Sequence, residues 1–231
     1  MININIFSDF ACPWCYIGEK RLDSAITKAG LGGKINLVYR SFQLDPNAPK
    51  NSDKTTVERL ASKYNLSPEA AQKRIAMVDK AGKGEGIDFN FGGVKPSNTF
   101  DAHRLMKLAE QAYDSLTVQK LNYGLFDANF TKNLNLSDPE VLTEIGKAAG
   151  LDAEDIKNML NSDQYKEDVI NDENVAKNLG ITSVPCFIIG NIAIPGAIST
   201  EDFVDAIEKY GKESISESGS GCSCDESGCN I

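Results

Sequence analysis

Residues 8–22 read SDFACPWCYIGEKRL, and this stretch decides the fold. It follows an alternating apolar segment at residues 2–7, which predicts a short strand. After Cys15, apolar residues recur with helical spacing up to the glycines at 30–33, so a helix is predicted to end there. Residues 35–42, INLVYRSF, predict a second strand. A strand, a helix and a strand with short connections form a βαβ unit, so we expect the two strands to be parallel.

Cys12 and Cys15 lie three positions apart where the predicted helix begins. Side chains at that spacing share one face of a helix, within the separation that a disulfide spans. Unpaired N–H groups and the positive end of the helix dipole stabilise a thiolate there, so we expect Cys12 to be an exposed nucleophile. Pro13 fits the first helical turn, where its missing N–H costs nothing. Cys15, a turn further in, is then the buried resolving thiol.

The alternative interpretation of the CPWC pair is half of a zinc site. A structural zinc site needs about four ligands, whereas the chain has no second CxxC motif and a single histidine. A strand, a CxxC pair and a helix in succession are typical of redox proteins. We therefore expect no metal and no cofactor apart from the redox-active disulfide, with glutathione as a candidate co-substrate.

Composition and charge exclude several partners. The chain has 231 residues, 41% of them hydrophobic and 25% charged, as in ordinary globular proteins. Its formal net charge of -9 disfavours nucleic acid and anionic membrane surfaces as ligands. We see neither a secretory signal nor the run of about 18 apolar residues that a membrane span needs. We expect a cytoplasmic protein, and closely paired cysteines in that compartment are more often redox-active or metal-binding than structural.

The middle of the chain is predicted to be helical and without a convincing strand. Strand pattern returns at residues 186–190 and 192–194, before a last helix from 199 or 200 to 211. The strands of both ends together make one small mixed sheet, and the helical block is an insertion between them. The helices predicted in the block span 55–65, 67–83, 98–111, 114–131, 138–149, 152–161 and 163–179.

This order of elements predicts an α/β protein, a small mixed sheet with flanking helices and a large all-helical insertion that covers the Cys12 end. We assign residues 1–50 and 163–211 to the core and 51–162 to the insertion. Residues 212–231 are polar and rich in serine and glycine, so we expect a flexible, cysteine-containing tail.

Val184 and Pro185 precede the strand predicted at residue 186. Proline is allowed at the first position of a strand, and X–Pro bonds can be cis. Proline statistics alone favour a trans bond, since only about 5–6% of such bonds are cis. Cys186 follows, in alternation with Ile188, and we interpret it as a small buried hydrophobe rather than a third redox thiol.

Several motifs together resemble the DsbA family of thioredoxin-like oxidoreductases, and its FrnE-like branch in particular. They occur in collinear order over residues 1–210, and their combination is specific. The resemblance implies a thioredoxin-like fold in which Cys12 is the nucleophile, Cys15 the resolving cysteine and Pro185 a cis-proline facing them. Val184 would offer its backbone N–H and C=O to an extended substrate. The motifs are SDFACPWCYIGEKRL, SFQLDP, SNTFDAHRL, LFDANF and GITSVPCFIIGNIAIPGA.

Other residues are candidates for substrate contact. Pro13 and Trp14 lie between the cysteines, and we interpret Trp14 as a platform for substrate rather than a simple surface contact. His103 could act in proton transfer at the cysteine pair, or pack between the insertion and the core. Arg104 is interpreted as a solvated helix residue. The large apolar residues of the insertion are expected in its core: Met77, Met106, Phe126, Phe130 and Met159.

The function predicted from these residues is exchange of disulfides with protein substrates, with protein thiols, protein disulfides or glutathione as partners. The alternatives are a glutathione-dependent transferase or isomerase of the same fold, whose members usually lack the second cysteine, and a non-catalytic adaptor.

The tail adds three candidate auxiliary thiols, Cys222, Cys224 and Cys229. They could bind a metal, remain inert, or exchange disulfides with the CPWC pair.

Overall fold

The computed structural model describes residues 1–50, 54–94 and 97–211. The predicted βαβ unit is present as β1 (Ile2–Ser8), α1 (Pro13–Lys28) and β2 (Ile35–Ser41). Strands β1 and β2 are parallel, as expected. Cys12 is the N-cap residue of α1 and Pro13 opens its first turn. Because proline has a fixed φ and needs no N–H acceptor at this position, the helix begins directly after the nucleophile candidate.

The sheet is small and mixed, which confirms the predicted class. β3 (Cys186–Ile189) runs antiparallel to β1, and β4 (Ile192–Pro195) runs antiparallel to β3. The strand order is β2-β1-β3-β4 among the residues that the structure describes. The chain then enters α9 (Thr200–Tyr210), which the hydroxyl of Ser199 caps.

The helical block between β2 and β3 is confirmed for residues 54–94 and 97–185, where the structure contains no strand. Two of its predicted starts have the expected chemistry, since the side chains of Ser67 and Asp138 each accept a hydrogen bond from a backbone N–H of the following turn. The helices are α2 (Thr56–Tyr64), α3 (Pro68–Gly84), α4 (Phe100–Ala112), α5 (Ser115–Phe130), α6 (Pro139–Ala149), α7 (Ala153–Leu160) and α8 (Lys166–Asn178).

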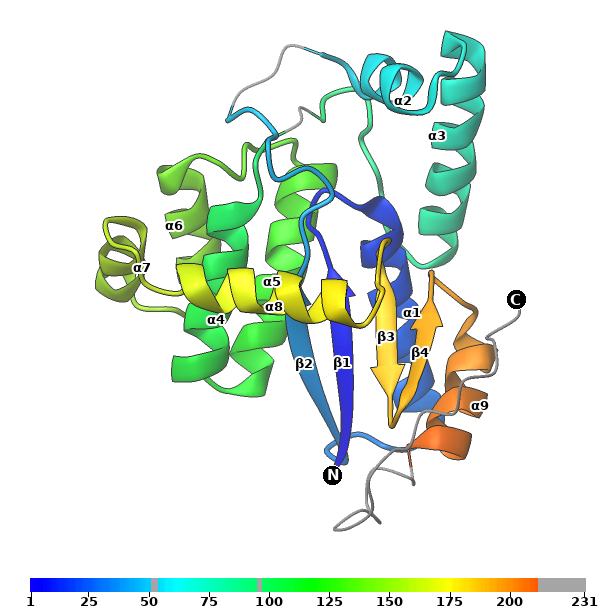
Figure 1. Cartoon of the computed structure of the whole chain (residues 1–231), viewed down its shortest axis with the longest axis vertical. Helices are drawn as coiled ribbons and strands as arrows, with labels where there is room; N and C mark the ends of the chain where they lie inside the picture. The colour runs from blue at the N-terminus through cyan, green and yellow to red at the C-terminus, as the bar shows by residue number, and fades with distance from the viewer. Residues whose placement is uncertain (51–53, 95–96, 212–231) are drawn as a thin grey trace.

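Two hydrophobic clusters lie on opposite faces of the sheet. Ile4 and Ile6 of β1 belong to the larger cluster, with α1 and α9, whereas Phe7 belongs to a smaller one with Ala176 of α8. Figure 1 shows α8 crossing one face of the sheet while α1 lies behind it. Cys186 is buried in the smaller cluster, beside Phe7 and Ala176, and burial raises the pKa of its thiol.

An aromatic cluster joins the first turn of α1 to the helical block. The rings of Tyr16 and Phe126 are stacked with centroids 5.0 Å apart, and Phe10 lies 5.0 Å from the same Phe126 ring. Met106, Phe126, Phe130 and Met159 are buried as predicted. The prediction for Met77 is wrong, because its side chain projects from α3 and is 59% exposed.

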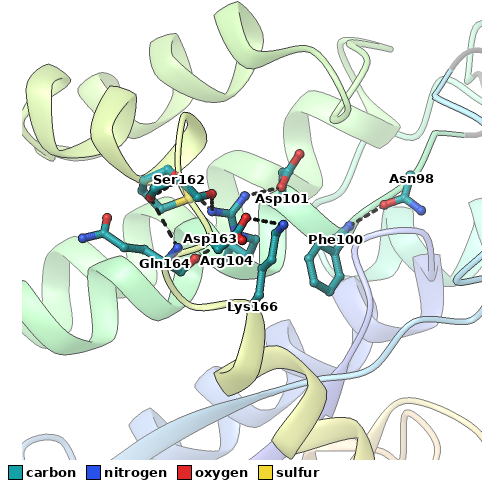
Figure 2. Close-up of polar contacts among 9 residues, drawn as sticks. Asn98, Phe100, Asp101, Arg104, Ser162, Asp163, Gln164 and Lys166 are labelled. Atoms are coloured by element: carbon teal, nitrogen blue, oxygen red, sulfur yellow. Dashed lines mark hydrogen bonds and ion pairs between the residues drawn. The ribbon is translucent and has the colours of Figure 1, made fainter.

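The interpretation of Arg104 as a solvated residue is also wrong. Its side chain is 3% exposed, and its guanidinium donates to the carbonyls of Met159 and Ser162 at 2.6 Å and of Gln164 at 2.8 Å. Asp101 supplies a carboxylate at 2.7 Å (Figure 2). The last carbonyls of a helix lack intrahelical donors, so Arg104 completes the end of α7 and the turn before α8 from its position on α4.

The division into a core of residues 1–50 and 163–211 and an insertion of 51–162 stays a prediction. The tail of residues 212–231, with Cys222, Cys224 and Cys229, lies outside the described residues. Within the described ranges, none of the helices combines the length and the apolar character that crossing a bilayer requires.

Candidate redox site

The two CPWC cysteines are free thiols at the start of α1. The backbone N–H of Cys12 donates to the carbonyl of Asp9 at 2.9 Å, and that of Cys15 donates to the carbonyl of Cys12 at 3.1 Å. Cys15 is fully buried, as predicted. The pair therefore stands on one short turn, where the two sulfurs can be joined without unwinding the helix.

The expectation that Cys12 is exposed is wrong, because only 5% of the residue is accessible. A loop from the far end of the sequence covers it. The sulfur of Cys12 lies 3.5 Å from the carbonyl oxygen of Val184, to which its S–H donates. Val184 itself is half-buried. The loop that carries Val184 therefore limits access to the sulfur.

The bond between Val184 and Pro185 is cis, as the resemblance to the family implied. Pro185 is buried, and its carbonyl accepts a hydrogen bond from the N–H of Gly196 at 2.8 Å. This bond joins the loop before β3 to the loop after β4. The chain thus presents the carbonyl of Val184, next to the cis-proline, directly to the Cys12 sulfur.

The thiol of Cys15 is in an unusual electrostatic environment. Burial raises its pKa well above the ordinary value, and the adjacent Cys12 sulfur adds to the effect. The carboxyl of Glu19, one turn further along α1, acts in the same direction. Cys15 accordingly stays protonated at neutral pH unless a base takes its proton.

Glu19 is a functional candidate that sequence reasoning missed. It is 2% exposed, accepts a hydrogen bond from the hydroxyl of Ser8 at 2.7 Å, and accepts another from the amide of Asn122. Burial raises its pKa to about 8, against the lowering effect of those two donors. Its spacing of four residues from Cys15, inside an otherwise apolar helix face, is the signal that could have identified it.

Asp9 holds the loop that leads to Cys12. Its carboxylate accepts hydrogen bonds from the Thr99 hydroxyl at 2.8 Å and from the N–H groups of Ala11 at 3.1 Å and Leu44 at 2.7 Å. Burial alone would raise the pKa of Asp9, but His103 and the backbone donors hold it below its ordinary value. Because Asp9 binds its own turn, the segment at Leu44 and the start of α4 at once, it fixes the turn from which α1 departs.

His103 lies against this loop from the α4 side. Its Nε2 atom is 3.5 Å from the Asp9 carboxylate, and its ring centroid is 5.0 Å from that of Phe10. The side chain is buried, and Nε2 has no hydrogen-bond partner in the structure. Of the two interpretations open from the sequence, this geometry supports packing between the helical block and the core.

The remaining candidates divide between the two faces of the sheet. Pro13 and Trp14 are half-buried beside the cysteines, and Trp14 packs against the larger hydrophobic cluster. Cys186 belongs to the smaller cluster, whereas Cys12 and Cys15 belong to the larger one. In the part of the chain that the structure describes, no three His, Cys, Asp or Glu side chains are grouped as metal ligands would be.

Comparisons with known proteins agree with this geometry. A family model described as DSBA-like thioredoxin domain matches residues 3–208. The protein YwbO of Bacillus subtilis is 25% identical over 218 residues, which are 92% of this chain and 98% of that protein.

Solved structures show the same similarity. A probable DsbA oxidoreductase of Streptomyces coelicolor superposes with a TM-score of 0.85 at 29% identity, covering 100% of this chain and 99% of that one. The cytosolic disulfide reductase DsbM of Pseudomonas aeruginosa, in a structure with GSH, has a TM-score of 0.58 at 12% identity, covering 91% and 96% of the two chains. At that identity the second likeness concerns the fold alone.

Proposed function

The chain belongs to the DSBA-like thioredoxin domain family, and we propose that it exchanges disulfides with protein substrates through Cys12 and Cys15. One observation supports this most strongly. Two free thiols stand at the start of a helix, and the sulfur of the first lies 3.5 Å from the carbonyl that precedes a cis-proline. Cys12 stands at the N-cap of α1 and is assigned the first attack, whereas burial holds the proton on Cys15.

The reaction has two steps. In the first, the Cys12 thiolate attacks one sulfur of the substrate disulfide, that S–S bond breaks, and the other substrate sulfur leaves as a thiolate. In the second, Cys15 loses its proton and attacks the Cys12 sulfur of the mixed disulfide. A Cys12–Cys15 disulfide forms, and the substrate departs with both of its sulfurs reduced. Two molecules of a small thiol then reduce the pair and are themselves oxidised to a disulfide.

The surroundings of Cys12 fit an extended polypeptide as substrate. The backbone of Val184 can pair with a strand, and Pro13 and Trp14 offer apolar surface beside the sulfur. We assign these three residues to substrate contact, and Pro185 to shaping the loop on which Val184 lies. His103 is assigned to support of the Asp9 loop rather than to proton transfer.

We assign Glu19 the role of accepting the proton of Cys15 in the second step. It lies one helical turn from Cys15, and a group with a pKa of about 8 can take up and release a proton near neutral pH. Its hydrogen-bond partners, Ser8 and Asn122, keep the carboxyl oriented in the apolar interior.

The Glu19→Gln variant tests this role first through stability. Wild-type Glu19 keeps its proton up to about pH 8 in the folded state, whereas the unfolded chain loses it near the ordinary value of 4.5. Stability of the wild type is therefore lost as pH rises through this window, by on the order of 3 kcal/mol between pH 5 and 8 relative to the variant. Urea unfolding of both proteins at each pH measures the difference, and equal pH dependence would contradict the buried, protonated state.

The same variant has a kinetic readout. Glutamine keeps the hydrogen bonds, because its amide can donate to the Ser8 hydroxyl while its oxygen accepts from Asn122, but it cannot take a proton. We expect the second step to slow by about 100-fold at pH 8, with the first step unchanged. Rapid quenching with acid, followed by mass spectrometry of the mixed disulfide, separates the two steps.

A cytoplasmic location and glutathione as the reducing thiol are part of the proposal. DsbM, which has a similar fold, is described as a cytosolic disulfide reductase and was solved with GSH, and we extend both properties to this chain as part of the proposal. The proposed exchange requires a thiol in excess, and glutathione fills that role in the cytosol.

Insulin reduction by dithiothreitol, with and without the protein, tests the proposed function. We expect the protein to accelerate reduction of the insulin disulfides and to catalyse little conjugation of glutathione to an electrophilic aryl halide. Conjugation without insulin reduction would instead identify a glutathione transferase. Absence of both activities would identify a non-catalytic adaptor.

A further inference from the structure

Helix α1 approaches the cis-proline loop very closely at Gly18. A Cβ atom on this residue would lie 3.1 Å from Cζ of Phe187 and 3.3 Å from both Cγ of Pro185 and Cβ of Ala197. The Phe187 ring cannot retreat freely, since it is fully buried and packs edge-on against Phe203 at 4.8 Å. The absence of a side chain at Gly18 therefore sets how near the loop comes to the helix.

Arg21 binds the same region from one turn further along α1. Its Nη1 donates to the carbonyl of Ala197 at 2.7 Å and to that of Ile198 at 3.4 Å. Its Nε pairs with the carboxylate of Glu85 at 2.7 Å, directly after the end of α3. Figure 1 shows this end of α3 beside α1 and the end of β4. Both side chains of the pair are about four-fifths buried, with 20% and 19% exposed.

These contacts form an unbroken series that ends at the nucleophile candidate. Glu85 holds Arg21, and Arg21 holds the carbonyls that follow Gly196. The N–H of Gly196 donates to the carbonyl of Pro185 at 2.8 Å. The preceding carbonyl, that of Val184, accepts from the Cys12 sulfur at 3.5 Å.

We propose that Gly18 and Arg21 are positioning residues that hold the Val184 carbonyl against the Cys12 sulfur, and that Glu85 links this placement to α3 of the helical block. The inference deepens the proposed function and rests on it, because it concerns the reactivity of the same sulfur.

The contact between Cys12 and Val184 discriminates between the two redox states of the pair. A thiol has a hydrogen to donate to the Val184 carbonyl, whereas a sulfur in a disulfide has none. The contact therefore stabilises the reduced pair as long as Cys12 is a thiol, and it does not stabilise the disulfide. Loosening the loop removes that advantage and shifts the thiol–disulfide equilibrium toward the Cys12–Cys15 disulfide.

Three variants test the proposal: Gly18→Ala, Arg21→Met and Glu85→Gln. Each full-length protein is equilibrated with a series of glutathione redox buffers, and the fraction of Cys12–Cys15 disulfide is measured by acid quenching and peptide mapping. We expect Gly18→Ala and Arg21→Met each to shift the equilibrium constant about threefold toward the protein disulfide, as loss of one weak hydrogen bond predicts. Glu85→Gln shifts it in the same direction by less.

The chain offers a matched control for each kind of change. Lys28 is also on α1 and pairs with Glu201 of α9 at 2.8 Å, but both of these side chains are mostly exposed, at 58% and 69%. Gly84 is also a helical glycine, and a Cβ atom there would meet nothing within 4 Å. We expect Lys28→Met and Gly84→Ala to leave the equilibrium constant at the wild-type value.

Non-additive shifts of the equilibrium constant would show that Arg21 and Glu85 act through the same contact. Arg21→Met and Glu85→Gln act through one contact, so the double variant should shift the equilibrium no further than Arg21→Met alone. Arg21→Lys should behave as Arg21→Met, since an ammonium group cannot reach the carbonyls and Glu85 with the fork geometry of a guanidinium.

The redox-buffer experiment tests the positioning role independently of the insulin test of the proposed function. Equilibrium shifts in the predicted direction support the positioning role even if the wild type fails to accelerate insulin reduction. Equilibrium constants equal to those of the controls in both Gly18→Ala and Glu85→Gln would overturn it, whether or not Arg21→Met folds and whether or not insulin is reduced.

Discussion

Replacing Cys12 by serine is expected to abolish disulfide exchange, with a loss of at least about 10³-fold in the rate of insulin reduction. A serine hydroxyl does not ionise at neutral pH and cannot form the mixed disulfide. The first position of the pair, at the start of α1, then carries no sulfur that could attack a disulfide.

Cys186 provides the matched control for this experiment. It is the third free cysteine among the described residues, it is equally buried, and it packs with Phe7 and Ala176 in the smaller cluster. The Cys186→Ala protein should retain the wild-type rate. If Cys12→Ser retains exchange activity and this activity disappears when Cys186 is also replaced, the reacting cysteine is Cys186 and our assignment of Cys12 is wrong.

The largest expected effect on stability comes from Arg104. Replacement by methionine keeps much of the side-chain volume but removes the guanidinium that donates to the carbonyls of Met159, Ser162 and Gln164, the first of these contacts being buried and the other two partly buried. We expect the free energy of unfolding to fall by about 3–5 kcal/mol, because buried charge networks cost this much when one partner is removed. Urea denaturation followed by circular dichroism measures the change.

Lys166, in the same part of the molecule, controls for the loss of a positive charge. It pairs with Asp163, which is 85% exposed, so the pair lies in solvent (Figure 2). Lys166→Met should change the free energy of unfolding by less than about 0.5 kcal/mol. If Arg104→Met lowers the free energy of unfolding no more than Lys166→Met does, the carbonyls bound by Arg104 have found other hydrogen-bond partners.

The sequence predicted those parts of the fold that depend on local signals. The βαβ unit follows from strand alternation, helical spacing and the glycines after α1. Helix starts such as Ser67 and Asp138 have side chains that cap their own helix, so they could be identified without knowing any distant contact.

Long-range contacts explain where the prediction failed. The exposure of Cys12 depends on Val184, 172 residues away, whose loop covers the sulfur. Arg104 looks like any charged helix residue until α7 ends against it. Glu19 reads as an ordinary helix residue, since its partner Asn122 is 103 positions distant. His103 had two open interpretations because its neighbour Asp9 comes from another element.

The central claim is that Cys12 attacks and Cys15 resolves. Its most direct test uses proteins in which Cys222, Cys224 and Cys229 are serine, so that tail thiols cannot take part. Reduced Cys15→Ser protein and its Cys15-containing parent are mixed with oxidised glutathione, quenched with acid at intervals, and mapped by mass spectrometry. We predict a lasting glutathione adduct on Cys12 in Cys15→Ser, and its rapid conversion to a Cys12–Cys15 disulfide in the parent. Release of the adduct at the same rate in both proteins, or an adduct elsewhere with Cys12 unmodified, would contradict the assigned roles.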